Sequence, residues 1–314
     1  MKVKYCVMIL VLAVVFLYCS RDTESPTRLS TNDIDGLKPK YPIPGKILFQ
    51  SDMDGDREIY MLTKDSVTKL TDNDWDDEFP KWSPDGTKIA YSANPKGNYD
   101  IFIMNADGSN ITPVTTSPKA EIEHAWFPNG KRIAFTIEQR KGFRKRFSLW
   151  MIDLQSQRIN RILSEFEGSS SLPNFSPNAP LIAFTGKKTI GWDVFMYDRR
   201  SKEIEALTEG GKACRAHFSR DGRRIAYVSA KADGNGDIWL MNPDGSGKMR
   251  LTERDDTSDY FPCWSPDGRT IVFSSSLEHR IDRGNWSLFL VDVKTKEILP
   301  LFDSPGRDVF PDWK

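Results

Sequence analysis

One short phrase recurs along the chain and constrains its fold more than any other feature. It stands at Phe79–Gly86 and again at Tyr260–Gly268, each time as Trp-Ser-Pro-Asp-Gly followed closely by an apolar run. Proline presets the backbone for a turn, aspartate bonds to nearby backbone N–H groups, and glycine accepts a positive φ. Because apolar runs flank this turn on both sides, each copy predicts a β-hairpin.

The strand after this turn recurs six times, at intervals of 42 to 49 residues. Its leading positions are Ile47, Ile89, Ile133, Ile182, Ile225 and Ile271. Three further strand-like series run in phase with it, and the last of them is centred on an aromatic side chain. These aromatic positions are Trp82, Trp126, Phe175, Phe218, Trp264 and Trp313. Four strands repeated six times at this period predict a β-propeller, with the aromatic residues packed between blades.

The phase of the repeats predicts how the ring closes. The repeats begin on the strand at Ile47 and end on a lone strand of the aromatic series, Val309–Trp313. We expect this last strand to pair with the strand at Ile47 and complete the first blade, since closure removes exposed sheet edges. Residues 46–314 are therefore predicted to form one all-β domain, a six-bladed β-propeller of four-stranded blades.

The first 45 residues predict a targeting segment and a tether. Lys2 and Lys4 precede an apolar run over residues 7–18, which is too short to span a bilayer comfortably. Cys19 ends this run, and residues 20–45 are rich in Ser, Thr, Asp and Pro, as in a flexible tether. Residues 1–19 resemble a bacterial lipoprotein signal with Cys19 as the lipidated residue. Ordinary secretion and an uncleaved anchor are the alternatives.

The repeats resemble the TolB-type propeller. The motifs that carry the resemblance are Trp264–Gly268, Asp237–Gly245 and Arg250–Thr252, and the resemblance covers all six repeats. It implies a periplasmic, scaffold-like propeller whose partner in the TolB family is the peptidoglycan-associated lipoprotein Pal. TolB carries an α/β domain before its propeller, whereas only the 26 residues 20–45 separate Cys19 from the first blade here. We therefore expect a TolB-like lipoprotein that lacks this domain.

The charge balance narrows the class of partner. The chain has 44 basic and 44 acidic residues, so its formal net charge is zero, which argues against a nucleic-acid-binding protein. We expect a monomer in the periplasm or at the cell surface, held at the membrane by its lipid anchor alone, at the outer membrane in a Gram-negative cell. Its predicted role is non-catalytic binding of an envelope protein, such as a Pal-like lipoprotein, or of a glycan, without a cofactor.

Propeller topology predicts the surface that binds this partner. The Ser-Pro-Asp-Gly turns emerge together on one side, which we call the turn face. Connections on the opposite side, which we call the loop face, vary in length and charge, and binding loops gather on one side of a rigid scaffold. The predicted partner-binding residues of the loop face are Asp74, Trp75, Asp76, Asp77, Phe143, Arg144, Arg146, Asp256, Asp259, Tyr260 and Arg283.

Motifs for metal binding and nucleophilic catalysis are weak. The acidic run Asp52–Glu58 looks like the start of an EF-hand loop but lies between two predicted strands, so we interpret it as a solvated turn. His124, His217 and His279 are too dispersed for a zinc site, and the chain has no Gly-x-Ser-x-Gly elbow. We therefore expect no metal ion and no catalytic residue.

An enzyme with its site in the channel remains the alternative. It would resemble the propeller lyases that degrade pectate, would act on carbohydrate or peptide, and would use His124, His217, Glu123 and Arg215.

The two cysteines of the propeller are predicted to be free thiols. Cys214 and Cys263 lie on inner strands of neighbouring blades but are three residues out of register, roughly 10 Å along a strand. That offset disfavours a disulfide.

Overall fold

A computed structural model describes the chain except for residues 1–33, 35, 142–143 and 278–283. The predicted lipidation site Cys19 and the predicted partner-binding residues Phe143 and Arg283 lie outside the described residues. Among the residues that are described, no helix is both long and apolar enough to cross a bilayer.

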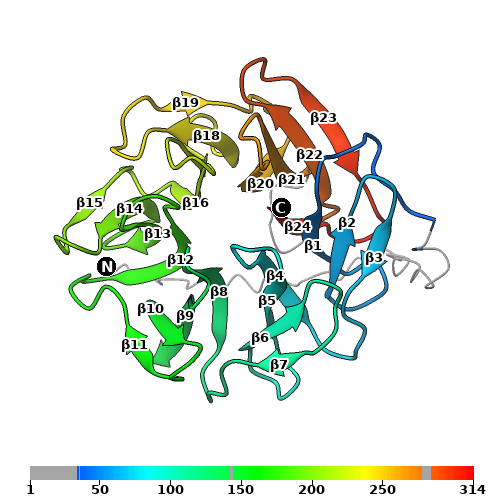
Figure 1. The fold of residues 1–314 in the computed structure, drawn as a ribbon. Coiled ribbons are helices and arrows are strands. Elements are labelled where there is room, and N and C mark those ends of the chain that lie inside the picture. The colour runs from blue at the N-terminus through cyan, green and yellow to red at the C-terminus, as the bar shows by residue number, and fades with distance from the viewer. Residues whose placement is uncertain (1–33, 35, 142–143, 278–283) are drawn as a thin grey trace, which may run out of the picture.

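Within the described residues, 24 strands form six antiparallel, four-stranded sheets arranged as blades in a ring (Figure 1). From the channel outwards, blades 1 and 2 consist of β24 (Val309–Trp313), β1 (Ile47–Ser51), β2 (Glu58–Leu62) and β3 (Val67–Lys69), then β4 (Asp77–Trp82), β5 (Lys88–Ala93), β6 (Asp100–Asn105) and β7 (Thr112–Pro113). Blades 3 and 4 consist of β8 (Glu121–Trp126), β9 (Arg132–Lys141), β10 (Arg144–Asp153) and β11 (Ile159–Arg161), then β12 (Ser169–Phe175), β13 (Leu181–Lys187), β14 (Asp193–Asp198) and β15 (Ile204–Ala206). Blades 5 and 6 consist of β16 (Ala213–Phe218), β17 (Ile225–Ser229), β18 (Asp237–Met241) and β19 (Met249–Arg250), then β20 (Ser258–Trp264), β21 (Thr270–Ser276), β22 (Ser287–Asp292) and β23 (Ile298–Phe302). The predicted six-bladed propeller is confirmed.

The C-terminal strand closes the ring as predicted. β24 is the innermost strand of blade 1, where it pairs antiparallel with β1 and places Trp313 opposite Ile47. Two backbone hydrogen bonds between Lys46 and Lys314 extend this pairing, with N–O distances of 2.7 and 2.9 Å. Both ends of the propeller are therefore fastened in one blade, and β24 gives β1 the inner neighbour that completes its four-stranded sheet.

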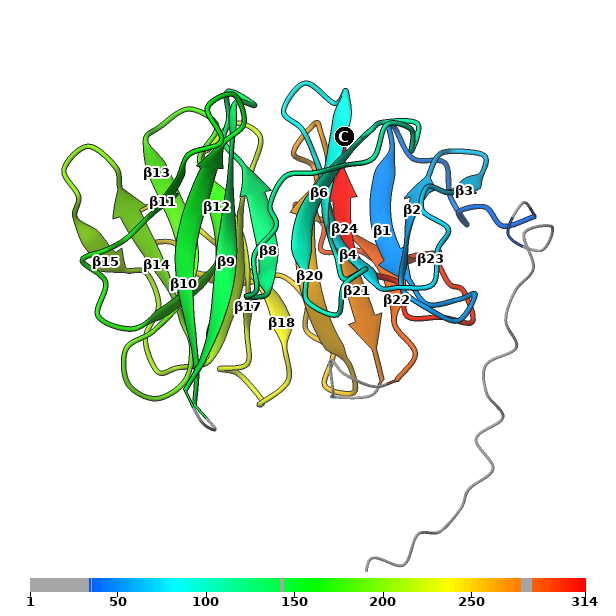
Figure 2. The ribbon, with the colours of Figure 1, turned by 90° about the horizontal axis from the view of Figure 1, so that it is seen from below.

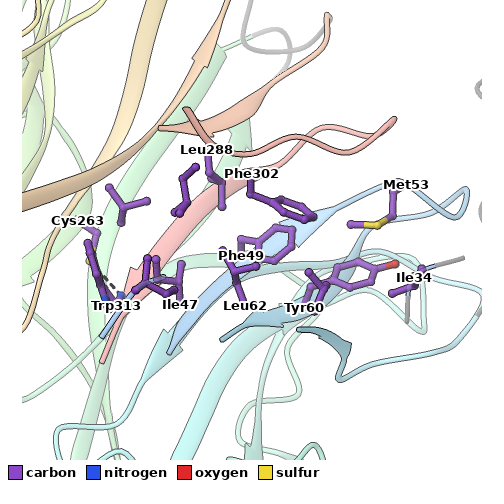
Figure 3. Packing of buried hydrophobic residues seen from close by; sticks show 14 residues of the cluster. Ile34, Ile47, Phe49, Met53, Tyr60, Leu62, Cys263, Leu288, Phe302 and Trp313 are labelled. Carbon is purple, nitrogen blue, oxygen red and sulfur yellow. Dashed lines mark hydrogen bonds between the residues drawn. The ribbon is translucent and has the colours of Figure 1, made fainter. Parts of the chain in front are cut away.

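The apolar core consists of layers between neighbouring blades. Figure 3 shows one layer, in which Phe49 and Tyr60 of blade 1 meet Leu288 and Phe302 of blade 6. The ring centroids of Phe49 and Phe302 are 5.2 Å apart. Strands such as β1 are buried along their whole length because each blade is covered on both faces by its neighbours. This explains why the propeller strands read as continuous apolar runs.

The inner-strand aromatics join each blade to the preceding one, as predicted. The indole N–H of Trp126 in blade 3 donates to the backbone oxygen of Lys81 in blade 2, at 3.1 Å. Trp264 in blade 6 donates in the same way to His217 in blade 5, at 3.0 Å. The recurring aromatic position is thus a contact between blades.

Each inner strand carries a β-bulge with the same backbone geometry. Pairing with the next strand shifts register at the bulge, and the residue there has a positive φ between 51° and 59° although it is not glycine. Such a φ is uncommon for residues other than glycine, so its sixfold repetition is a property of the fold. The six bulge residues are Phe79, Glu123, Leu172, Arg215, Phe261 and Phe310.

Candidate functional site

Two rings of side chains line the axial channel. The first, which we call the bulge ring, consists of the six bulge residues named above, all of which border one small cavity. The second, which we call the polar ring, lies two residues further along each inner strand, nearer the turn face. Its members are Lys81, Ala125, Asn174, His217, Cys263 and Asp312.

The bulge ring fills the middle of the channel. The Arg215 guanidinium carbon lies 4.3 Å from the ring centroid of Phe261 and 5.5 Å from that of Phe310, a cation–π arrangement. Phe310 also packs against Phe79, with ring centroids 4.4 Å apart. The remaining cavity measures about 70 Å³, whereas pockets for small molecules occupy about 300–1,000 Å³. A sugar or peptide does not fit at this level.

Two residues of the alternative enzyme site lie at the same level of the channel. Burial raises the pKa of Glu123, although the charge of Arg215 opposes that effect. His124 is buried, its Nδ1 lies 3.3 Å from Ser92 Oγ, and burial lowers its pKa to about 4. The structure therefore brings Glu123 and Arg215 together and keeps His124 as a neutral, buried imidazole.

A larger cavity lies between the polar ring and the turn face. Its volume is about 340 Å³, within the range of ligand pockets. Its walls are inner-strand aromatics, prolines of the turns and polar side chains: Trp82, Trp126, Phe175, Phe218, Pro84, Pro128, Pro177, Lys81, Asn174, His217, Arg220 and Asp312. We call it the turn-face cavity. The sequence analysis did not predict this cavity. The signal that could have predicted it is the position just before the recurring aromatic residue, which is polar in most repeats.

Polar-ring side chains accept backbone hydrogen bonds from the next blade. Asn174 Oδ1 accepts from the Phe218 N–H at 2.8 Å, and Asp312 Oδ2 accepts from the Trp82 N–H at 2.7 Å. The other oxygen of Asp312 lies 3.3 Å from Lys81 Nζ. Burial alone would raise the pKa of Asp312, but Lys81, His217, the Trp82 N–H and Arg220 together outweigh it and hold the pKa below its usual range.

The predicted loop-face residues of blades 1 and 2 differ in exposure. Asp74 and Trp75 are exposed. Asp76 instead forms an ion pair with Arg57, with an N–O distance of 3.3 Å. Asp77 is fully buried and accepts a 2.8 Å hydrogen bond from Asn73, and burial raises its pKa to about 6. Asp76 and Asp77 therefore hold neighbouring loops in place.

The predicted residues of blades 5 and 6 show the same division. Asp256 is exposed, whereas Asp259 is buried and bonded to Arg254 at 2.5 Å. Tyr260 packs edge-on against Trp286, with ring centroids 6.0 Å apart.

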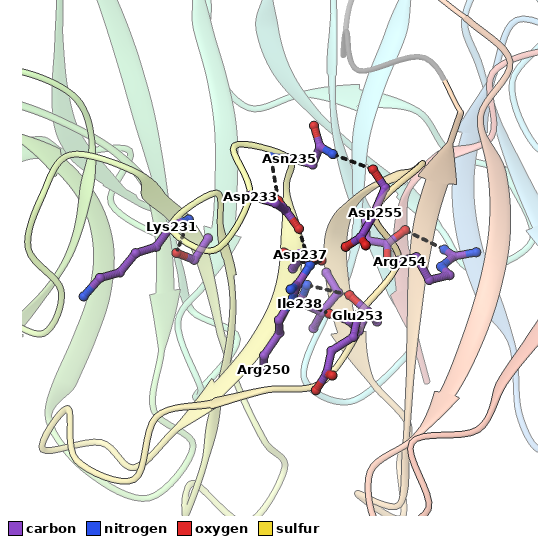
Figure 4. Close-up of polar contacts among 12 residues, drawn as sticks. Lys231, Asp233, Asn235, Asp237, Ile238, Arg250, Glu253, Arg254 and Asp255 are labelled. Atoms are coloured by element: carbon purple, nitrogen blue, oxygen red, sulfur yellow. Dashed lines mark hydrogen bonds and ion pairs between the residues drawn. The ribbon is translucent and has the colours of Figure 1, made fainter.

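Three contacts hold the loops that join β17 to β18 and β19 to β20 (Figure 4). Asn235 Nδ2 donates to the backbone oxygen of Asp255 at 3.0 Å, which links two loops. Arg250 forms ion pairs with Asp233 and Asp237. This part of the loop face is consequently held by internal bonds before any partner arrives.

The β9–β10 hairpin protrudes at the loop face, along the lower edge of Figure 2, whereas the C-terminus lies at the upper edge. Arg144 begins β10, and Arg146 is exposed with its Nε 3.4 Å from the backbone oxygen of Gly168. Among the described residues, the predicted set is thus exposed at Asp74, Trp75, Arg146 and Asp256.

Three exposed apolar side chains lie on different loops of the loop face. Ile190, in the β13–β14 loop, is 90% exposed, and Leu277, after β21, is 71% exposed. Trp75, between blades 1 and 2, is 40% exposed. Sequence reasoning did not single out Ile190, because one isoleucine in a polar loop carries no periodic signal.

Two further sequence predictions concern turns and thiols. The acidic run from Asp52 lies in the β1–β2 turn, as predicted, and its side chains are engaged: Asp52 accepts from the Arg307 N–H at 2.7 Å, and Asp54 pairs with Lys69 at 2.5 Å. Cys214 and Cys263 are both free, which confirms that prediction.

Comparison with known proteins shows the family. The TolB beta propeller domain matches residues 22–162 and 141–282. The chain is 25% identical to the Tol-Pal system protein TolB of Francisella tularensis subsp. holarctica over 290 residues, covering 76% of this chain and 64% of that protein's length. It is 26% identical to dipeptidyl-peptidase 5 of Porphyromonas gingivalis, covering 79% of this chain and 37% of that protein.

Solved structures share the fold. TolB from Acinetobacter baumannii superposes with a TM-score of 0.71 at 18% identity, over 86% of this chain and 67% of that one. An oligogalacturonate lyase in complex with manganese superposes with a TM-score of 0.51 at 16% identity, over 84% of this chain and 73% of that one. On the strength of the domain match, which spans most of the propeller, this chain belongs to the TolB beta propeller domain family.

Proposed function

We propose that this protein is a non-catalytic propeller of the bacterial envelope that binds a protein partner through its loop face. Its family and the TolB relatives named above support an envelope role. We place it in the periplasm or at the cell surface as a monomer, anchored to the membrane by a lipid on Cys19. The filled bulge ring supports a scaffold role, because the channel centre has no space for a substrate.

The observation that carries this proposal is the placement of exposed apolar side chains. Trp75, Ile190 and Leu277 belong to loops of different blades yet share one face of the ring. A small ligand or short glycan cannot reach all three, whereas a protein interface of standard size covers about 800 Å² per partner. Buried apolar and aromatic anchors supply most of the binding energy in such interfaces. A protein is therefore favoured over a glycan.

The loops of the loop face are held in place before a partner binds. The internal bonds of Asp76, Asp77 and Asp259 fix the loops between the exposed anchors, so little ordering has to accompany association. The name of the Francisella relative, a Tol-Pal system protein, supports a Pal-type lipoprotein as the first partner to test.

Combined substitution of the three exposed apolar side chains is expected to weaken this interaction. The triple variant Trp75→Ala, Ile190→Ser, Leu277→Ser should weaken binding of the purified Pal periplasmic domain from the same organism at least about tenfold, because hot-spot truncations cost about 2 kcal/mol or more. Isothermal titration calorimetry measures the change.

The turn face offers a matched control. Ile111 and Ile159 are also exposed, at 52% and 45%, but follow turns of the opposite face. The variant Ile111→Ser, Ile159→Ser should retain wild-type affinity. Equal losses in both variants, or unchanged binding in the triple variant, would remove the loop face as the interface.

A further inference from the structure

We propose that His217, Cys263 and Asp312 form a binding site for a zinc-like divalent metal ion at the polar ring. One potential ligand atom from each side chain lies within 4.8 Å of the other two. The three residues come from β16, β20 and β24, the inner strands of three successive blades around the closed ring. Closure of the propeller by β24 is what brings Asp312 to the other two.

The donor set selects the class of metal. Imidazole nitrogen, thiolate sulfur and carboxylate oxygen are the ligands that zinc takes in proteins, usually in tetrahedral geometry. A thiolate ligand disfavours Ca²⁺ and Mg²⁺, which prefer oxygen ligands alone. Three protein ligands leave a fourth position open. His217 and Asp312 border the turn-face cavity, so that position has access to a ligand from the turn face.

Neighbouring backbone groups already orient two of the ligands. The Trp313 N–H donates to Cys263 Sγ at 3.2 Å, as Figure 3 shows, and the Trp82 N–H donates to Asp312 Oδ2. Donors of this kind stabilise a thiolate and fix a carboxylate, as outer-shell groups do in metal sites. Asp312 Oδ1 is left to face the cluster.

An independent observation comes from the imidazole. Nδ1 of His217 is buried and has no hydrogen-bond partner in the described part of the chain. A buried polar nitrogen without a partner is costly, and most such atoms in folded proteins are satisfied. Coordination to a metal ion would satisfy it.

Lys81 is the cation that a metal ion would displace. Its Nζ lies 3.3 Å from Asp312 Oδ1, and its side chain is 26% exposed and borders the turn-face cavity. On metal binding, the Cys263 S–H bond breaks, the sulfur–metal bond forms, and the thiol proton leaves to solvent. The Lys81 side chain turns into the cavity.

Metal titration of the chelator-stripped, full-length protein tests the site. We expect one Zn²⁺ bound per chain, and Co²⁺ in its place should give a thiolate-to-cobalt charge-transfer band. Cys263→Ala should remove the band and weaken Zn²⁺ binding at least about tenfold. Cys214→Ala is the matched control, because Cys214 is the other free cysteine of the described residues and lies on a neighbouring inner strand outside the cluster.

A second variant keeps the test informative should loss of Cys263 unfold the chain. Lys81→Met leaves all three ligands in place and removes the competing ammonium, so it should tighten Zn²⁺ binding severalfold. Absence of stoichiometric Zn²⁺ in the wild type, an unchanged cobalt spectrum in Cys263→Ala, or weaker binding in Lys81→Met would each overturn the proposal.

Discussion

Replacing Trp313 with alanine should lower the free energy of unfolding by about 3–5 kcal/mol, as for other large-to-small changes at a buried aromatic. Trp313 is only 2% exposed and packs in the layer between blades 1 and 6. Its indole N–H donates to the backbone oxygen of Pro44 at 2.7 Å, so the substitution also removes this hydrogen bond. Since β24 fastens the ring, the loss weakens closure itself.

Urea denaturation followed by far-ultraviolet circular dichroism measures this loss without depending on tryptophan fluorescence. Trp75→Ala is the matched control, because it removes the same side chain from an exposed loop, and it should change stability by less than about 0.5 kcal/mol. A total stability of about 5–15 kcal/mol leaves the Trp313 variant close to unfolding. Similar midpoints for the two variants would show that closure by β24 contributes little to stability.

The propeller could be predicted from the sequence because its signals are local and repeated. The Ser-Pro-Asp-Gly turn and the apolar run after it define one hairpin, and the phase of the repeats assigns Val309–Trp313 to the first blade. Because there are six similar copies, a repeat with an ambiguous sequence can be assigned by alignment with the others. The bulges were not predicted, because residues as different as Glu123, Leu172 and Phe310 adopt the same left-handed φ. No shared side chain marks that position.

The candidate sites were harder to predict because they depend on the ring as a whole. Aligning the repeats places Cys263 level with His217, but only closure around the axis brings Asp312 within reach of both. On the loop face, Asp77 and Asp259, which the sequence predicts as partner-binding residues, are buried. A carboxylate in a polar loop has the same sequence signature whether it faces solvent or a neighbouring blade.

Buried carboxyl groups give the fold a characteristic response to pH. Glu58 and Asp308 are fully buried, and burial raises the pKa of each to about 8 against the hydrogen bonds that would lower it. Burial likewise raises the pKa of Glu121 to about 7. The Lys69 Nζ atom lies 3.7 Å from Glu58 Oε1 but only 2.5 Å from Asp54 Oδ2, so its positive charge mainly compensates the charge of Asp54. Glu58 therefore remains protonated near neutral pH.

Stability should accordingly fall as pH rises from about 6.5 to about 8.5. In this window the carboxyls of the unfolded chain are ionised, whereas the folded chain still binds protons on Glu58, Asp308 and Glu121 and must lose them. Each such group contributes a slope of at most about 1.4 kcal/mol per pH unit. His124 and His217, with pKa values lowered to about 4 and 3, act in the opposite direction and only below about pH 6.5.

Urea denaturation at the two pH values measures the fall, and Glu58→Gln isolates one contributor. The glutamine keeps an oxygen for the Asn73 N–H, which donates to Glu58 at 2.7 Å, but cannot ionise, so the variant should lose less stability between the two pH values than the wild type. Glu209→Gln, at an exposed site, is the matched control and should follow the wild type. An equal fall in all three proteins would mean that Glu58 is already ionised at the lower pH. In that case Lys69 would balance the charge of Glu58 and not the charge of Asp54.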